Sequence, residues 1–422
     1  MSIQPAEVSL DQIDLSDIEF WAQPPAFREG AFKTLREQRP MAFLAEPELP
    51  PEAPVPPGPG YWAVTRHADV IEASRNPEVF SSGRGATSIP DLPEMFLEFF
   101  GSMINLDDPR HARLRRIVSA GFTPRMLKKL EDDVARAAAE IVDDLLAKEH
   151  CDFVTDVAAR LPLKIICDMM GIGESDYATV FNASNIILSA GDPEYMPEGA
   201  DPLATLFGAA QDLNNLVQDL GRQRRGSPTD DLTSALVNAE VEGEQLSDGE
   251  LGSFFILLVV AGNETTRNAI SHGLVQLTDH PDQLRALAAD FDGMAGPAVE
   301  EIVRWASPVI WMRRSATQDT VLGGEKVSEG DKLLLFYSSA NRDADVFSDP
   351  FRFDITRSPN PHVGFGGPGP HFCLGAHLAR REITVMYREL LRRAPAIHAT
   401  AEPERLRSNF INGIKHLGCS IR

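Results

Sequence analysis

Cysteine is scarce in this chain: only Cys151, Cys167, Cys373 and Cys419 occur among 422 residues. No Cys-x-x-Cys pair and no cysteine–histidine cluster is present, which argues against a zinc module. Cys151 and Cys167 lie in stretches of apolar periodicity, where a cysteine usually serves as a plain buried side chain. This usage fits a protein of the reducing cytoplasm.

Positive charge and long apolar runs are also in short supply. Lys and Arg number 40 against 62 Asp and Glu, so the net charge of −22 disfavours nucleic acid and anionic membranes as partners. The longest apolar run, residues 254–261, is far shorter than a bilayer crossing requires. The first residues lack a basic region followed by an apolar one, so no signal peptide is expected. We therefore expect a cytoplasmic protein without a membrane span.

Internal repeats and an interior linker are absent as well, which indicates a single large domain over residues 1–422. Within it, residues 1–60 form an N-terminal segment whose proline-rich part, 46–60, predicts an extended surface loop. Helical periodicity is found at residues 67–75, 109–148 (interrupted at Thr123-Pro124), 161–170, 203–224 and 248–277. Strand patterns are found at residues 61–65, 320–327 and 332–337, with a final β-hairpin at 410–421. The fold class expected is mainly α with small β-sheets.

A glycine- and proline-rich loop delivers the third cysteine to the start of a predicted helix. Residues 365–377 read FGGPGPHFCLGAH, with Cys373 near the end of the loop. Because a helix N-terminus stabilises negative charge, we expect Cys373 to be a thiolate at neutral pH. Gly375 removes a side chain where a flat macrocycle would need close approach. The combination favours a metal ligand over a structural cysteine.

The expected helix 248–277 carries a second unusual feature, a stripe of four residues on one face. Leu257, Ala261, Glu264 and Thr265 share one helical face, because residues four apart stack. The hydroxyl of Thr265 can donate to the carbonyl of Ala261 and open the helix locally. A buried helix with a capping-type Glu-Thr pair is the alternative interpretation.

The loop and the stripe together resemble the cytochrome P450 family. The loop is similar to the family's Phe-Gly-x-Gly-x-His-x-Cys-x-Gly, but Phe365 lies eight residues before Cys373 rather than seven, so the loop is one residue longer. The stripe resembles the family's Ala/Gly-Gly-x-Asp/Glu-Thr signature. The resemblance implies a P450 fold that holds heme b, with Cys373 on the iron and Ala261 against the heme. It also implies that Thr265 steadies dioxygen and that Glu264 relays protons.

Further segments match parts of the family that support the cofactor. Glu301 and Arg304 form a Glu-x-x-Arg pair, which in isolation would be an ordinary helical ion pair. The resemblance implies that this pair has a structural role and that Arg352 is the arginine that joins it as the third member of a buried network. It also implies four contacts to the heme propionates, in keeping with the affinity of cations for carboxylates. These contacts are His111, Arg115, Arg314 and His371.

The implied activity is a monooxygenase that inserts one oxygen atom of O2 into a C–H or C=C bond and reduces the other to water. A heme protein that only binds a gas would not need the pair Glu264 and Thr265, and peroxide-driven relatives replace that pair. No flavin or NAD fingerprint is present, so the expected electron donors are a ferredoxin and a ferredoxin reductase. The residues expected to form a basic docking patch for an acidic ferredoxin are Arg113, Arg116, Arg380 and Arg381.

The substrate is expected to be apolar and lipid-like, because few charges occur among the candidate pocket residues. These candidates are Leu257, Val260, Val309, Ile310, Trp311 and Phe410. Residues 254–270 and 299–314 are especially similar to bacterial hydroxylases of methyl-branched lipids, isoprenoids and sterol side chains. That resemblance implies terminal (omega) hydroxylation. The runner-up is a compact terpenoid or polyketide oxidised at an internal carbon or double bond.

The cysteine assignment yields a direct prediction. Replacing Cys373 with Ser should abolish the long-wavelength Soret band of the reduced carbonyl complex, because that band reports a thiolate ligand. The measurement is a difference spectrum of the purified, heme-loaded variant. Survival of the band in Cys373→Ser would show that another residue ligates the iron.

Overall fold

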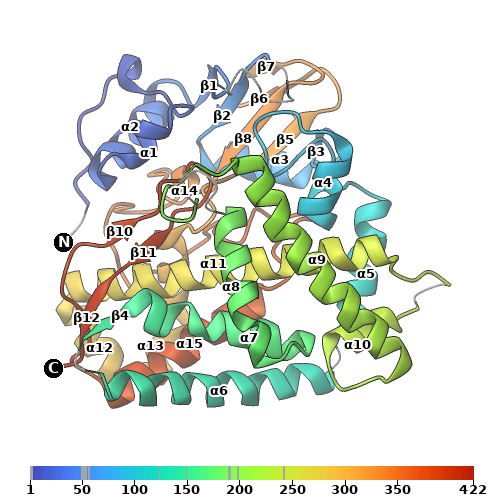
Figure 1. Ribbon diagram of the computed structural model, residues 1–422. Helices are drawn as coiled ribbons and strands as arrows, with labels where there is room; N and C mark the ends of the chain where they lie inside the picture. The colour runs from blue at the N-terminus through green and yellow to red at the C-terminus, as the bar shows by residue number, and fades with distance from the viewer. Residues whose placement is uncertain are drawn as a thin grey trace.

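A computed structural model describes residues 3–48, 55, 58–122, 124–148, 150–188, 192–196, 199–240 and 243–422. Most of its regular structure is helical, and a small sheet region lies at the upper right of Figure 1. Much of the proline-rich segment, at residues 49–54, 56 and 57, lies outside the described residues, so the extended loop predicted there is not tested.

The helices at the five ranges of apolar periodicity, α3, α5 with α6, α7, α9 and α11, begin and end close to the predicted positions; several of the others were not predicted. Their bounds are α1 Ile18–Ala22, α2 Pro25–Gln38, α3 His67–Arg75, α4 Glu94–Gly101, α5 Arg110–Gly121, α6 Pro124–Leu146, α7 Arg160–Met170, α8 Tyr177–Leu188, α9 Pro202–Gly226, α10 Leu232–Val237, α11 Asp248–Asp279, α12 Pro281–Ala289, α13 Phe291–Ala306, α14 Tyr337–Ala340 and α15 Ala376–Arg393. Short 3-10 turns cover Leu10–Gln12, Ser102–Asn105 and Glu174–Asp176, and a π-helical turn covers Val154–Ala158.

The strands are short and form small sheets. Their bounds are β1 Met41–Leu44, β2 Tyr61–Val64, β3 Phe80–Ser81, β4 Cys151–Asp152, β5 Trp311–Ala316, β6 Thr320–Leu322, β7 Glu325–Val327, β8 Lys332–Phe336, β9 His398–Ala399, β10 Glu404–Arg405, β11 Ile414–His416 and β12 Gly418–Ser420. The largest sheet has the order β1-β2-β8-β5-β3, with β2 and β8 parallel and its other pairs antiparallel. The fold is mainly α with small sheets, as predicted.

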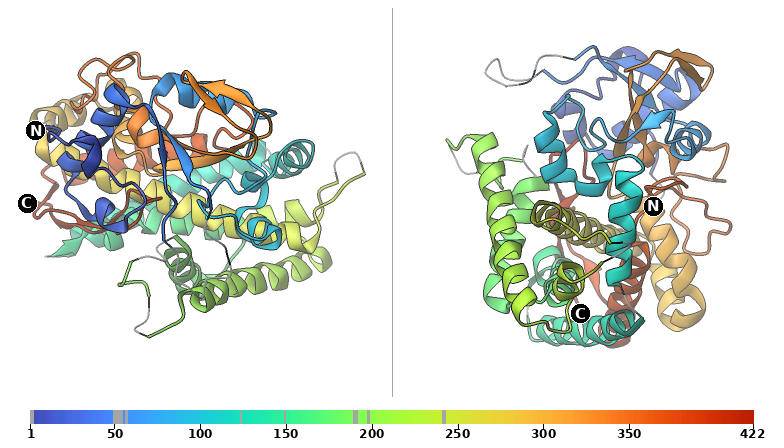
Figure 2. Two further views of the ribbon diagram at one scale, coloured as in Figure 1. Left: turned by 90° about the horizontal axis from the view of Figure 1, so that it is seen from above. Right: turned by 90° about the vertical axis from the view of Figure 1, so that its right-hand side faces the viewer.

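Helix α11 runs through the middle of the helical part of the molecule. It begins with a capping box, in which the side chains of Ser247 and Glu250 each accept the other residue's backbone N–H. Its sequence is apolar over most of its circumference, so the helix can be enclosed, and it packs against α4, α7, α8, α9 and α13. The right-hand view of Figure 2 looks nearly along its axis. Across the described residues, no helix combines the length and apolar composition needed to cross a bilayer.

Two strand predictions need correction. The segment 320–327 is not one strand, because Gly323 and Gly324 adopt positive φ angles of 57° and 86° and turn β6 back onto β7. The C-terminal residues 410–421 do not form a hairpin with each other. Strand β11 pairs with β10, whereas β12 pairs with β4 and β9, so the tail ties together two separate sheets.

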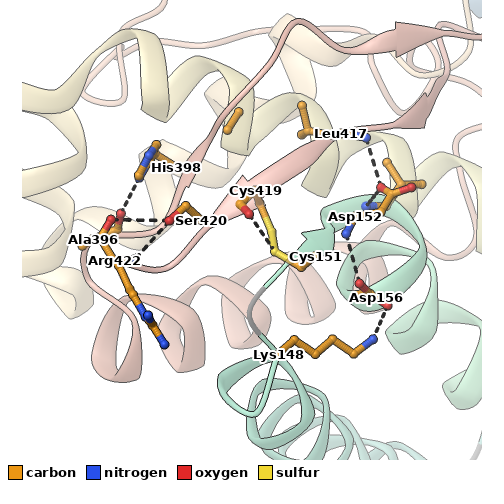
Figure 3. The surroundings of a disulfide bond; sticks show 12 residues. Lys148, Cys151, Asp152, Asp156, Ala396, His398, Leu417, Cys419, Ser420 and Arg422 are labelled. Carbon is orange, nitrogen blue, oxygen red and sulfur yellow. Dashed lines mark hydrogen bonds and ion pairs between the residues drawn. A yellow bond between two sulfur atoms is a disulfide. The ribbon is translucent and has the colours of Figure 1, made fainter.

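Cys151 also has a different place from the one predicted. It is only partly buried and forms a disulfide with Cys419, which joins β4 to β12 across 268 residues of sequence (Figure 3). The two Cα atoms are 5.5 Å apart, because the residues are paired neighbours in the antiparallel sheet. Cys167 is buried and free, as expected.

The Glu-x-x-Arg pair is the centre of a buried network. Arg304 donates to Glu301 from Nε at 2.7 Å and from Nη2 at 2.8 Å, and both side chains are fully buried. The prediction that Arg352 completes this network is wrong. Arg357 donates from Nε to Glu301 at 3.1 Å, whereas Arg352 is exposed and supplies its backbone carbonyl to both arginines. The network fixes the segment that leads toward the Cys373 loop.

The network predicts unequal effects for two arginine substitutions. Arg357→Ala should lower the free energy of unfolding by about 3 kcal/mol, because it removes a partner from a buried carboxylate. Arg352→Ala should change it by no more than about 0.5 kcal/mol, since the exposed side chain can be lost while the carbonyl stays. Urea unfolding followed by circular dichroism measures both values. Equal losses in the two variants would contradict this assignment.

Candidate functional site

The loop that carries Cys373 is held by its own backbone and by α3. The N–H of Cys373 donates to the carbonyl of Phe365 at 3.0 Å. Gly369 has a φ of +143°, and a Cβ there would come within 2.3 Å of the carbonyl oxygen of Ser74, so the loop passes α3 at a distance only glycine allows. The extra residue in the loop is therefore accommodated without separating Phe365 from the cysteine.

The ring of Phe365 contacts a group of charged side chains close to the cysteine loop. The guanidinium of Arg380 lies 4.4 Å from the centre of the Phe365 ring. Arg380 also donates to Glu300 at 2.5 Å and 2.9 Å, and Glu300 contacts His362 at 3.0 Å. Both partners lower the pKa of Glu300 to about 2 against the raising effect of burial. Phe365 could be picked out from the loop motif, whereas no local pattern pairs Glu300 with Arg380 and His362.

The electrostatics of Cys373 differ from the prediction. The residue keeps an exposed surface, yet protein surrounds the sulfur closely enough that burial raises the pKa of the thiol. Hydrogen bonds from the N–H groups of Gly375 and Ala376, and the charges of Arg115 and Arg380, lower it less strongly. Helix α15 begins only at Ala376, so its N-terminus does not by itself make Cys373 a thiolate. A coordinated metal would have to complete the deprotonation.

A cluster of cationic side chains lies next to this loop. The rings of His111 and His371 are 4.2 Å apart, and Nε2 of His111 is buried without a hydrogen-bond partner. Burial, followed by the charges of Arg314, His111 and Arg115, lowers the pKa of His371 to about 2. The four predicted propionate contacts are thus brought together. Like charges buried in one place are unfavourable unless an anion joins them.

Arg115 also holds the cysteine loop through hydrogen bonds to its backbone. It donates from Nη1 to the carbonyl of Pro370 at 2.9 Å and from Nη2 to that of Phe372 at 2.8 Å. These bonds tie α5 to the cysteine loop. Arg314 is buried, and its Nη1 donates to the carbonyl of Arg313 at 2.8 Å.

Helix α11 presents the predicted alcohol beside a small exposed residue. Oγ1 of Thr265 donates to the carbonyl of Ala261 at 2.6 Å, as the spacing predicts. Ala261 is exposed although it lies in the middle of the central helix, and Leu257 and Val260 are partly exposed. An exposed stretch in the middle of an enclosed helix marks a space that the protein side chains do not fill.

Glu264 does not share this open face as closely as predicted. Its side chain is fully buried, and Oε2 forms an ion pair with Arg267, while Asn268 lies 3.5 Å away. Burial raises the pKa of the carboxyl in spite of the charge of Arg267. The i,i+3 spacing of Glu264 and Arg267 is a signal that sequence reasoning could have used.

The structure divides the predicted pocket residues. Ile310 and Trp311 are each 2% exposed and belong to a core with Trp21 and Phe336, so they offer no surface to a ligand and were wrongly assigned. Val309 and Phe410 retain partial exposure. Aromatic residues of α4 were missed: Phe96 and Phe100 contact Phe207 of α9 at ring distances of 4.8 Å and 5.4 Å.

Comparison with known proteins assigns the chain. The cytochrome P450 family model matches residues 64–394. The chain belongs to the cytochrome P450 family. A methyl-branched lipid omega-hydroxylase of Mycobacterium tuberculosis is 50% identical over 416 residues, 98% of this chain and 95% of that protein. A steroid C26-monooxygenase of Mycolicibacterium smegmatis is 41% identical, covering 85% of this chain and 82% of that protein.

Solved structures agree with this P450 assignment. The Mycobacterium marinum cytochrome P450 CYP268A2, in complex with pseudoionone, matches with a TM-score of 0.91 at 46% identity. The match covers 98% of this chain and 100% of that one. The family and the names of these relatives make the chain a P450 monooxygenase rather than a gas-binding heme protein.

P450 proteins carry a heme iron, and the residues of this chain fit that group. Gly375 has nothing within 4 Å of the place where a Cβ would stand, so a flat ring can approach there. Nε2 of His111 is buried without a hydrogen-bond partner, although Nδ1 of the same ring lies 3.3 Å from Asp108, so a further acceptor would fit beside it. When bound, the heme iron activates dioxygen. Cys373 would ligate it, and His111, His371 and Arg314 would hold its carboxylates.

Removal of the Thr265 hydroxyl should uncouple the consumption of NADH from product formation. Thr265→Ala should bind heme and substrate normally, yet lower the product formed per NADH by at least about tenfold, because proton delivery loses a positioned hydroxyl. Hydrogen peroxide should rise in step. Thr265→Ser keeps the hydroxyl and serves as the control. Unchanged coupling in the alanine variant would remove Thr265 from the reaction.

Proposed function

We propose that the chain is a heme b monooxygenase that hydroxylates the terminal methyl group of a methyl-branched or isoprenoid chain. The observation that carries this proposal is the 50% identity, over 98% of the chain, to methyl-branched lipid omega-hydroxylases. The steroid C26-monooxygenases point the same way, since their name also places the oxygen on a side-chain carbon. The oxygen would go into a C–H bond, with the second oxygen atom leaving as water.

The open face of α11 supports an apolar substrate. Leu257, one turn before the exposed Ala261, and Val260, next to it, add apolar surface on the side of Ala261 away from Thr265. Helix α4 packs against α11 and brings Phe99 and Phe100, both partly buried, to the same apolar core. A chain enclosed by such side chains would be held by burial of its methylene groups, at roughly 0.8 kcal/mol for each.

Electrons would come from a ferredoxin and a ferredoxin reductase in the cytoplasm. The basic docking patch is smaller than predicted, because Arg113 pairs with Glu244 and Glu250, and Arg380 pairs with Glu300. In the same predicted patch, the side chain of Arg116 is exposed and that of Arg381 is partly exposed. The Cys151–Cys419 disulfide does not support a cytoplasmic location, since disulfides are uncommon there.

The position of the oxygen in the product tests the proposal. A methyl-branched fatty acid, farnesol and cholesterol are each incubated with the enzyme, a ferredoxin, its reductase and NADH, and the products are analysed by mass spectrometry. We expect a heme spin-state shift on binding and a terminal alcohol as the main product. Oxidation only at internal carbons, or spin shifts only with polar compounds, would contradict the proposal and favour a compact terpenoid or polyketide.

A pocket variant sharpens this test. Leu257→Ala widens the apolar face beside Ala261, so internal carbons should reach the oxidation site and the terminal fraction of the product should fall. Leu146→Ala removes the same atoms from an exposed site at the end of α6 and should leave the product ratio unchanged.

A further inference from the structure

The disulfide between Cys151 and Cys419 joins two sulfur atoms that differ in their access to solvent. Cys151 of β4 is only partly buried, whereas Cys419 of β12 is 5% exposed. Thiol–disulfide exchange begins when a thiolate reaches one of the two sulfurs, so access decides which of them is attacked. In this disulfide the sulfur open to attack is that of Cys151.

Backbone pairing holds the two cysteines together independently of the bond between them. Cys419 lies opposite Cys151 in the antiparallel register of β12 with β4. Beside them, the N–H of Phe153 donates to the carbonyl of Leu417 at 2.7 Å, and the N–H of Leu417 donates to Oδ1 of Asp152 at 3.0 Å (Figure 3). Two thiols formed here would therefore stay neighbours, and the bond between them would be able to form again.

The disulfide fixes only the outer end of the C-terminal tail. Nearer to the pocket, the tail is held by side chains of α11: Oδ1 of Asn268 accepts the N–H of Ile414 at 3.0 Å, and Nε2 of His272 contacts the carbonyl of Asn412 at 3.0 Å. Along the chain these contacts lie between the disulfide and the partly exposed Phe410. Opening the disulfide would therefore release the outer strand and leave the part of the tail beside the pocket in place.

A cross-link over so long a stretch of sequence acts mainly on the unfolded chain. The two cysteines are 268 residues apart. The conformational freedom that a cross-link removes from the unfolded chain grows with the number of residues that it encloses. Formation of the disulfide should therefore make the protein harder to unfold, while the folded structure and its reaction change little.

We propose that Cys151 and Cys419 form a reversible redox site, at which low-molecular-weight thiols open the covalent link between β4 and β12 and the disulfides of these thiols close it. A small thiolate attacks the sulfur of Cys151, the S–S bond breaks, and Cys419 leaves as a thiolate that takes up a proton. A second small thiolate attacks the mixed disulfide and leaves as the small disulfide, and the sulfur of Cys151 takes up a proton. Two electrons thus pass from two small thiols to the cysteine pair. Such a site accounts for a disulfide in a chain for which we propose a cytoplasmic location.

Mass spectrometry of the holoenzyme in mixtures of reduced and oxidised glutathione tests this site. After alkylation with iodoacetamide, Cys151 and Cys419 should change together from two alkylated thiols to one disulfide as the oxidised share rises. The oxidised form should have a Tm roughly 3–6 °C above that of the reduced form, whereas kcat should differ by less than about twofold. Cys167 should stay unmodified in the folded enzyme, because burial raises the pKa of its thiol to about 12.

Single variants identify the sulfur that is attacked. Cys419→Ser leaves Cys151 without its partner, so oxidised glutathione should accumulate on Cys151 as a mixed disulfide. Cys151→Ser should leave the buried Cys419 unmodified. Cys167→Ser is the matched control, and its remaining pair should open and close as in the wild type.

A pair that stays oxidised, or stays reduced, at every glutathione ratio would overturn the proposal. Equal Tm values for the two forms would overturn it as well, and so would attachment of glutathione to Cys419 in place of Cys151. The comparison of the two wild-type forms needs no substitution, so it decides the proposal even where a variant fails to fold. The redox site does not depend on which carbon is oxidised, so a product with an internal hydroxyl would contradict the proposed substrate class and leave this site standing.

Discussion

The arrangement of this protein depends on basic side chains that are buried close to one another beside the cysteine loop. His111, His371 and Arg314 meet beside the cysteine loop, and the partner available to them is Asp108, 3.3 Å from Nδ1 of His111. Burial lowers the pKa of both imidazoles, the charge of Arg115 adds to this effect in both, and Asp108 opposes it at His111. Such a cluster is stable only when carboxylates from outside the chain complete it. Heme propionates would supply that charge, and binding of the cofactor would then be coupled to folding of this region.

Helix α11 combines an exposed face and a buried ion pair within two turns of the same segment. Around Ala261 and Thr265 it leaves an open face, where we propose that substrate binds, whereas at Glu264 and Arg267 it buries an ion pair against α8. A residue spacing of four keeps Ala261 and Thr265 together, and the intervening Glu264 is turned away from them. The open face can therefore stay apolar while the buried carboxyl of Glu264, which we propose as a proton relay, lies within one helical turn.

Local patterns in the sequence predicted the helices, the Cys373 loop and the bond from Thr265 to Ala261. Features that depend on packing between distant parts of the chain could not be predicted from these local patterns. Arg352 and Arg357 both lie in the right window, and only the path of the backbone decides which side chain reaches Glu301. The Cys151–Cys419 disulfide needs a sheet pairing across 268 residues. Trp311 is a large apolar side chain of the kind that often lines a pocket. In the sheet its side chain points into the core, where the indole N–H donates to the carbonyl of Asn409 at 2.8 Å.

X-ray absorption at the iron edge of the purified holoenzyme tests the central claim, that this fold presents Cys373 to a heme iron. We expect a sulfur atom in the first coordination shell together with the porphyrin nitrogens, and loss of that sulfur in Cys373→Ser. Cys167→Ser, at the buried free cysteine of α7, should leave the spectrum unchanged. A wild-type iron site with only nitrogen and oxygen ligands would contradict it.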